Sequence, residues 1–194
     1  GTFSGTYRVS TLVNISDYAR FNTHMVYTAG AGIWHLDLSS HAVNLLLTTS
    51  PNPVKLFTFK QKLYYTVGST LYTFDGINNT IIDTISINST LIIDSTLYMS
   101  AYKNGISGLY QMQPSSDSVS LLKQTYSSPA SLTNSGSLLY FTADDGASGN
   151  EVWVSDGTTA GTVIVKDINP SGSSSPSSLV GKYGKVYFSA NDGV

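Results

Sequence analysis

One short pattern recurs along the chain and constrains its fold more than any other feature. An aliphatic residue is followed by a tyrosine, one further residue and a small or hydroxylated residue, and the tyrosines are Tyr27, Tyr64, Tyr98, Tyr140 and Tyr187. A second aromatic residue follows 7 to 13 positions later, at Trp34, Tyr72, Tyr110 and Trp153. Neighbouring tyrosines are 34 to 47 residues apart. The chain is therefore a tandem repeat with a period of roughly 40 residues.

The residues around these anchors predict four short strands in each repeat. Runs of β-branched and aliphatic residues at 43–47, 81–85, 119–122 and 163–165 are bounded by Gly, Asn, Asp or Ser, as strands commonly are. Four antiparallel strands per repeat are typical of a β-propeller blade. We therefore predict an all-β fold, a propeller of about five four-stranded antiparallel blades. A β-sandwich or another β-rich repeat array is the alternative.

We expect one domain over residues 1–194, with units at roughly 10–47, 48–86, 87–122, 123–168, and 169–194 joined by 1–9. The first nine residues, GTFSGTYRV, repeat the Gly-Thr spacing of residues 157–165. They predict that the two termini share one blade, with residues 1–9 beside 179–190. Its aromatic third strand is missing from the sequence, so another subunit supplies it or the chain continues. Such an open edge predicts self-association into a filament or layer.

Charge and cysteine content exclude some functions. Charged residues make up 11% of the chain, against about 25% in an average protein, and the net charge is −2. The chain therefore lacks the basic surface that nucleic-acid binding requires. It has no cysteine, and no apolar run approaches the roughly 20 residues of a membrane span. We expect no nucleic-acid partner, no disulfide and no membrane insertion.

Three segments near the C-terminus carry a family resemblance: EVWVSDGT at 151–158, GTVIVKDINPSGS at 161–173 and VYFSANDG at 186–193. They resemble the bacterial repeat family named for its Glu-Leu-Trp-x-x-Asp-Gly-Thr signature, with Val152 in place of the leucine. The resemblance covers residues 135–194 and 1–9, while the units between have diverged. It implies a secreted or cell-surface prokaryotic protein with propeller-like arrays and, usually, no assigned activity.

The signature residues also have a physical interpretation as scaffold. Asp156 and Gly157 predict a turn between the third and fourth strands, because glycine readily adopts a positive φ. The large rings of Trp153 and Tyr140 are expected to fill the space between neighbouring blades. A family defined by such scaffold residues implies little about a specific function.

The best candidate for a ligand site is the acidic loop DDGASGNE at 144–151. Asp144, Asp145 and Glu151 could offer oxygens to Ca²⁺, and no other cofactor is expected. The loop lacks the alternating acidic spacing that wraps a chain around the ion. The matching loop KNGISG at 103–108 keeps the glycines and has no acid, which favours a structural hairpin.

Other candidate sites are weaker. His24, His35 and His41 lie in the first unit, where His35, His41 and nearby Asp37 could face one another, but zinc usually needs three or four ligands, so exposed strand positions are favoured. No recurring pair of acids and no Gly-x-Ser-x-Gly motif suggests catalysis. Sequons at Asn14, Asn78 and Asn88 permit N-glycosylation and are about as frequent as chance predicts.

The sequence predicts a non-catalytic extracellular or cell-surface binding or structural module. Its partner would be a protein, including further copies of the chain, or a glycan. The alternatives are a glycan-binding lectin and a glycan-active enzyme with its site in the propeller channel. Repeat loops of unequal length count against a lectin with one sugar site per blade.

Overall fold

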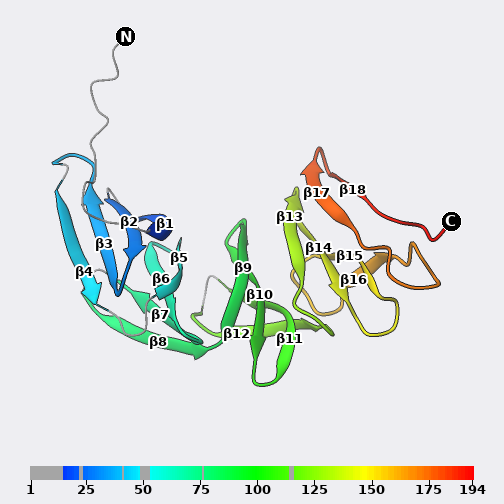
Figure 1. Cartoon of the computed structure of the whole chain (residues 1–194), viewed down its shortest axis with the longest axis horizontal. Helices are drawn as coiled ribbons and strands as arrows, with labels where there is room; N and C mark the ends of the chain where they lie inside the picture. Colours follow the sequence, from blue (N-terminus) through cyan, green and yellow to red (C-terminus); the bar gives the residue numbers. More distant parts are fainter. Residues whose placement is uncertain (1–14, 22–23, 41, 49–52, 76, 114–115) are drawn as a thin grey trace, which may run out of the picture. The chain divides into compact units, whose positions relative to one another are not determined.

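The structure, a computed structural model, describes residues 15–21, 24–40, 42–48, 53–75, 77–113 and 116–194 (Figure 1). These residues form eighteen strands and no helix, so the described part holds no helix that could cross a membrane. The chain divides into two compact units, Gly1–Thr84 and Ile85–Val194, which are described separately. A single domain over residues 1–194 stays a prediction.

The first unit contains two antiparallel sheets, each of four strands in chain order. One consists of β1 (Ile15–Phe21), β2 (His24–Ala29), β3 (Gly32–Asp37) and β4 (Val43–Thr48). The other consists of β5 (Pro53–Phe59), β6 (Lys62–Val67), β7 (Thr70–Phe74) and β8 (Asn79–Thr84). We call each sheet a blade and number the blades in chain order, so these are blades 1 and 2.

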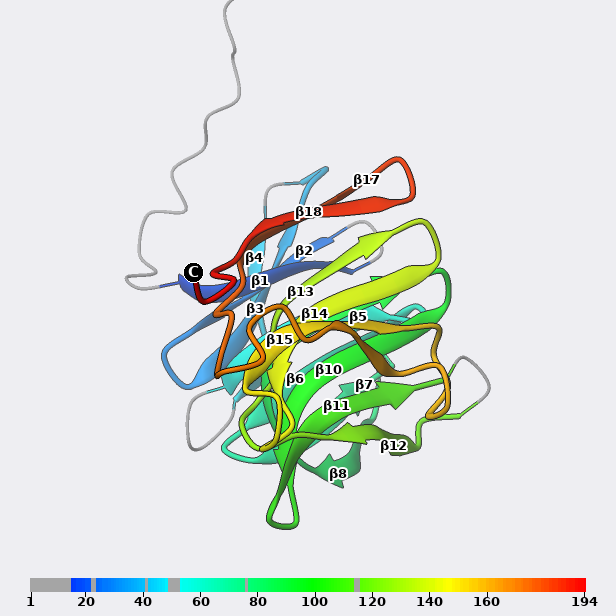
Figure 2. The same ribbon diagram turned by 90° about the vertical axis from the view of Figure 1, so that its right-hand side faces the viewer.

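The second unit contains three sheets. Blade 3 consists of β9 (Ser86–Ile93), β10 (Thr96–Lys103), β11 (Ile106–Met112) and β12 (Val119–Gln124). Blade 4 consists of β13 (Ala130–Ser135), β14 (Leu138–Asp144), β15 (Asn150–Ser155) and β16 (Val163–Lys166). Blade 5 is the hairpin of β17 (Ser177–Lys182) and β18 (Lys185–Ser189), which lies beside β13 in both views (Figures 1 and 2).

The predicted fold class is confirmed. Every four-stranded sheet pairs strands that are neighbours in sequence, as a propeller blade does, whereas a sandwich exchanges strands between two sheets. The shared terminal blade was predicted from residues 1–9, which lie outside the described residues.

A β-bulge recurs at one place in all four complete blades. The register between the third and fourth strands shifts by one residue between the second aromatic residue of each repeat and the aliphatic residue before it. The shifts lie at Ile33/Trp34, Leu71/Tyr72, Leu109/Tyr110 and Val152/Trp153. A second bulge lies between the first and second strands of all five blades. Bulges re-aim side chains and bend a strand. Because they recur at the same places in the blades, the repeat seen in the aromatic residues is also present in the backbone.

These registers change one alignment made from sequence. Trp34 pairs with Tyr27, whereas Tyr72 pairs with Tyr65, the residue after Tyr64. Tyr27 therefore corresponds to Tyr65, and the first repeat is shifted by one residue from the sequence pattern. The shift places four buried hydroxyl residues at one position of the second strand, namely Thr28, Thr66, Ser100 and Thr142. Residue type alone could not reveal this, because the tyrosine pattern matches either position.

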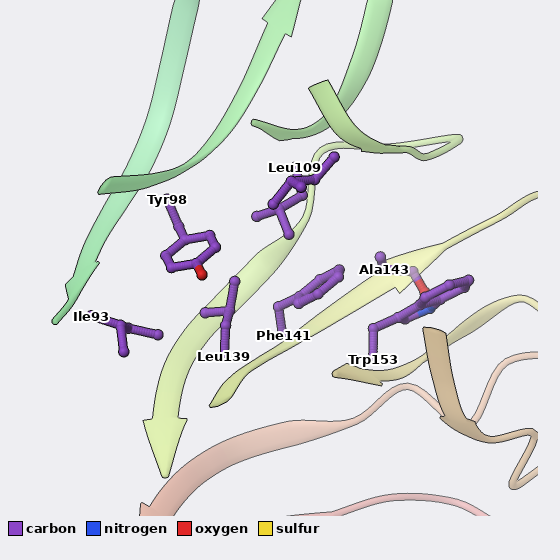
Figure 3. Close-up of a cluster of buried hydrophobic side chains, with 8 residues drawn as sticks. Ile93, Tyr98, Leu109, Leu139, Phe141, Ala143 and Trp153 are labelled. Atoms are coloured by element: carbon purple, nitrogen blue, oxygen red, sulfur yellow. The ribbon is translucent and has the colours of Figure 1, made fainter. Parts of the chain in front are cut away.

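Each unit has its own apolar core. In the first, Val26 and Ile33 of blade 1 pack with Leu56, Leu63 and Tyr65 of blade 2. In the second, Tyr98 and Leu109 of blade 3 pack with Leu139, Phe141 and Trp153 of blade 4 (Figure 3). The ring of Trp153 thus lies between two blades, where its indole N–H donates to the carbonyl of Ala143 (3.1 Å). Tyr140 is half-buried and lies outside this cluster.

The equivalent tyrosines Tyr27 and Tyr65 differ in one hydrogen bond. The Tyr65 hydroxyl donates to Oδ1 of Asn79 (3.0 Å), but Val43 occupies the corresponding position of blade 1. The Tyr27 hydroxyl is buried without a partner among the described residues. Burial raises the pKa of both phenols, that of Tyr65 to about 12, to which the nearby Tyr72 also contributes.

We therefore expect opposite results from the same substitution at the two positions. Tyr65→Phe should lower the free energy of unfolding by about 1 kcal/mol, because it removes a satisfied hydrogen bond. Tyr27→Phe should be neutral or stabilising, because it removes a buried hydroxyl that has no described partner. Urea unfolding of both variants measures the difference. An equal loss in the two variants would show that the Tyr27 hydroxyl is satisfied.

Candidate functional site

At one end of the second unit, hydrogen bonds hold two linkers against neighbouring strands, and we group the loops there as one surface. It comprises the β10–β11 turn (104–105), the linker 125–129, the β14–β15 loop (145–149) and the linker 167–176. We call this surface the loop platform. All four segments lie at the same end of their strands, because each follows a second or a fourth strand of an antiparallel blade.

Hydrogen bonds to both blades hold the part of the platform between blades 3 and 4. The backbone N–H of Thr125 donates to the carbonyl of Ser107 (2.9 Å), and the N–H of Tyr126 donates to the carbonyl of Asp144 (2.7 Å). The hydroxyls of Ser107 and Ser128 lie 3.1 Å apart. The linker is thereby fixed to a strand of each blade.

The part between blades 4 and 5 is held in the same way. The N–H of Asn150 donates to the Ser173 hydroxyl (2.5 Å), and the N–H of Ser175 donates to the carbonyl of Asn150 (3.2 Å). The N–H of Asn191 donates to the carbonyl of Ser174 (2.8 Å), which ties in the segment after β18.

Glu151, the chain's one glutamate, anchors this second part. Its side chain is fully buried at the start of β15. Its carboxylate accepts hydrogen bonds from the Ser174 N–H (2.8 Å), the Ser174 hydroxyl (2.6 Å) and the Ile168 N–H (3.2 Å). The residue proposed from sequence as a calcium ligand therefore holds both ends of the linker between blades 4 and 5.

The other two calcium candidates stabilise their own loop. Asp144 accepts the N–H of Gly146 (2.7 Å), and Asp145 accepts those of Ala147 (3.0 Å) and Ser148 (2.8 Å). The backbone hydrogen bonds from Ser148 and Ala147 lower the pKa of Asp145. Within the described ranges no three His, Cys, Asp or Glu side chains form a metal-binding group. Calcium binding by this loop stays a prediction.

Two tyrosine rings project from the platform end of the unit. Tyr126, in the linker after blade 3, is 80% exposed, and Tyr102, near the end of β10, is 50% exposed. The backbone of Tyr126 is fixed by its bond to Asp144, so its ring is presented from an ordered segment. Exposed aromatic rings on an ordered backbone offer a large contact area at a low cost in conformational entropy.

A recurring aspartate caps the turns at the opposite end of the strands. Asp37, Asp75 and Asp156 each follow the third-strand aromatic residue by three positions, and their Oδ1 atoms accept N–H groups two or three residues later. The hydrogen bonds lower the pKa of all three carboxyls; the strongest are from the Ser39 hydroxyl, the Asn78 N–H and the Thr158 hydroxyl, respectively. This recurrence was not identified from the sequence, because the full Asp-Gly-Thr triplet of the signature occurs only at 156–158.

The lowered pKa values predict the sign of a pH effect. A carboxyl whose pKa is lower in the folded protein stabilises the fold above its unfolded pKa of about 4, and the contribution is lost as the pH falls. Asp156→Asn should therefore have a lower Tm than the unchanged protein at pH 7. Calorimetry should show that the difference in Tm between the variant and the unchanged protein is smaller at pH 2.5 than at pH 7. A difference of the same size at both pH values would contradict the stabilising role of the ionised Asp156 carboxyl.

The Gly-Thr pairs of residues 157–162 complete the same turn. The Thr158 hydroxyl donates to Asp156 (2.7 Å) and accepts the Gly161 N–H (2.9 Å). A side chain at Gly161 would overlap the Asp156 carboxylate, and one at Gly157 would meet the Tyr98 hydroxyl of blade 3. Gly157 also has a φ of +89°. The signature spacing therefore encodes a turn that touches the preceding blade.

The remaining candidates are separated from the platform in sequence. The rings of His24 and His35 are 4.9 Å apart, whereas His41 lies outside the described residues. Asn78 is exposed in the β7–β8 turn, and Asn88 is exposed at the bulge of β9. Asn14 lies outside the described residues, and glycosylation stays a prediction at all three sequons.

Comparison with protein-family models and with curated proteins found no match to this chain. Several solved structures are similar in fold. One is the extracellular domain of a hybrid two-component system from B. thetaiotaomicron, which is 17% identical to this chain with a TM-score of 0.55. The match covers 75% of this chain and 21% of that domain's chain. This chain therefore spans about a fifth of that domain.

Two other structures resemble the chain at the same level. A chain in a nidogen/laminin complex is 13% identical, with a TM-score of 0.55, and the match covers 91% of this chain and 72% of that one. Puromycin hydrolase is 13% identical, with a TM-score of 0.57, and the match covers 73% of this chain and 26% of the hydrolase chain. At these identities the comparisons show the fold alone: an all-β array of propeller-like blades.

Proposed function

We propose that the chain is a non-catalytic, extracellular or cell-surface binding module, and that the loop platform is its binding surface. The observation that carries this proposal is the set of hydrogen bonds that orders the linkers around the exposed ring of Tyr126. Loops held rigid before binding lose little entropy when a ligand arrives. An extracellular location is supported by fold neighbours that are themselves extracellular domains.

The chemistry of the platform suits a glycan or a polar protein surface. An aromatic ring can stack on the apolar face of a sugar, and the serine hydroxyls of the linkers and the carboxylates of the adjoining β14–β15 loop can bind sugar hydroxyls. Asp144 and Asp145 accept backbone hydrogen bonds of their own loop, which supports a structural rather than a catalytic role for them. The proposal is therefore recognition without turnover.

A glycan array with the labelled protein tests this proposal, using Tyr126→Ala and Tyr183→Ala as a matched pair. Both rings are strongly exposed, 80% and 86%, but Tyr183 lies in the β17–β18 turn, at the far end of the hairpin from the platform. Glycan binding that Tyr126→Ala weakens at least about tenfold and Tyr183→Ala leaves intact would support the platform. Cleavage of the bound glycan would instead identify an enzyme.

Self-association is a second candidate function, supported by the surface of blade 5. Val180 and Tyr187 pair across β17 and β18 and are each 56% exposed. Exposed apolar pairs on an edge hairpin favour pairing with another strand. Sedimentation velocity at increasing protein concentration should show larger species, and Val180→Lys should abolish them. A monomer at all concentrations would refute self-association and leave the glycan experiment unaffected.

A further inference from the structure

Two histidines and an aspartate share one face of blade 1. In the pairing of β2 with β3, His24 lies opposite Asp37, and Val26 lies opposite His35. Alternate residues of a strand lie on the same face, so His24, His35 and Asp37 occupy adjacent positions of that face. The sequence pointed to His35 and His41, but the pairing brings His24 to His35.

The two imidazole rings are in direct contact. Their centroids are 4.9 Å apart and their planes are inclined by 86°, so the edge of one ring faces the other. The Nδ1 atom of His24 is buried and has no hydrogen-bond partner among the described residues. A buried imidazole nitrogen without a partner is unusual, because burying a polar atom unpaired costs free energy. An electron-pair acceptor such as a metal ion would satisfy it.

The pair lies next to an apolar core and to a carboxylate. Val26 and Ile33, on the same face, are buried in the core of the unit, so the half-buried histidines lie at the rim of an apolar region. Asp37 is held in place by the Ser39 N–H and hydroxyl and the Ser40 N–H, which all donate to Oδ1. Its negative charge beside His24 favours a positive ion over the pair.

We propose that His24 and His35 form a binding site for a divalent transition-metal ion of the Zn²⁺, Ni²⁺ or Cu²⁺ class. Imidazole nitrogen is a preferred ligand of these ions, whereas Ca²⁺ and Mg²⁺ prefer oxygen. No group of three metal-binding side chains forms within the described ranges, so the protein supplies two ligands and water completes the coordination. Asp37 supplies charge beside the site. This site is independent of the loop platform, which belongs to the other unit.

Titration of the EDTA-treated chain with ZnCl₂ by calorimetry tests the site. We expect one equivalent to bind, with affinity at least about tenfold weaker in His24→Gln and in His35→Gln, and about tenfold weaker in Asp37→Asn. His41→Gln is the matched control, since it removes the third histidine and should leave the affinity unchanged. Unchanged affinity in both His24→Gln and His35→Gln, or a loss confined to His41→Gln, would overturn the proposal.

A second measurement needs no variant and therefore does not depend on correct folding of the mutants. In NMR spectra of the histidine ring nitrogens, Zn²⁺ should shift the signals of two imidazoles together. A spectrum without zinc-dependent shifts would overturn the site directly.

Discussion

Replacing Glu151 with alanine is expected to lower the free energy of unfolding of the second unit by about 3 kcal/mol. The substitution removes a buried carboxylate that accepts three hydrogen bonds, two from Ser174 and one from Ile168. It leaves the Ser174 N–H and hydroxyl without these acceptors, and Ser174 is itself fully buried. Urea unfolding followed by circular dichroism measures the loss.

Asp94→Asn is the matched control for the removal of one negative charge. Asp94 is exposed in a turn with a φ of +52°, a conformation that asparagine also tolerates, so its substitution should be nearly neutral. Glu151→Gln should lie between the two variants, since it keeps one acceptor oxygen. A loss below about 1 kcal/mol in Glu151→Ala would contradict the anchoring role and reopen a role in ion binding.

Truncating Phe141 to alanine should have an effect of similar or greater size, a loss of about 4 kcal/mol. Its side chain is completely buried in the cluster that joins blades 3 and 4, and its ring stacks on Trp153 at a centroid distance of 6.4 Å (Figure 3). The change leaves a cavity lined by residues of both blades. Chemical unfolding of Phe141→Ala should show one transition at lower denaturant concentration.

Phe141→Leu is the conservative comparison, and it should cost about 1 kcal/mol because it keeps most of the apolar volume. Tyr140→Ala tests the neighbouring position, which is half-buried and outside the cluster. It should be the milder of the two alanine variants. A larger loss at Tyr140 than at Phe141 would mean that the register of β14 is displaced by one residue.

The repeating elements of the fold were predictable from sequence because they depend on local patterns. The spacing of aromatic residues gave the period and the four strands of each blade, and the structure confirms an all-β array of such blades. The register of blade 1 was not predictable, because Tyr27 fits the pattern at either of two adjacent positions and only the pairing with Trp34 decides. Bulges have no side-chain signature strong enough to reveal them from one sequence.

Contacts at the candidate sites were harder to predict because they join distant residues. The acidic loop at 144–151 suggests an ion site when considered alone, but Glu151 bonds to Ser174, 23 residues later. Likewise, His24 meets His35 through strand pairing, whereas sequence proximity favoured His41. The recurring aspartates could have been found, since three of the four third-strand aromatic residues are followed by an aspartate three positions later in the sequence.

The proposed function depends on the loop platform being rigid before any ligand binds, and hydrogen–deuterium exchange measures this directly. We predict slow exchange at the amides of Thr125, Tyr126, Asn150, Ser174 and Asn191, although most of them lie outside strands. Glu151→Ala should abolish the protection at Ser174 and leave that at Tyr126. Exchange of these amides at the rate of an unstructured peptide would contradict the platform and the function proposed for it.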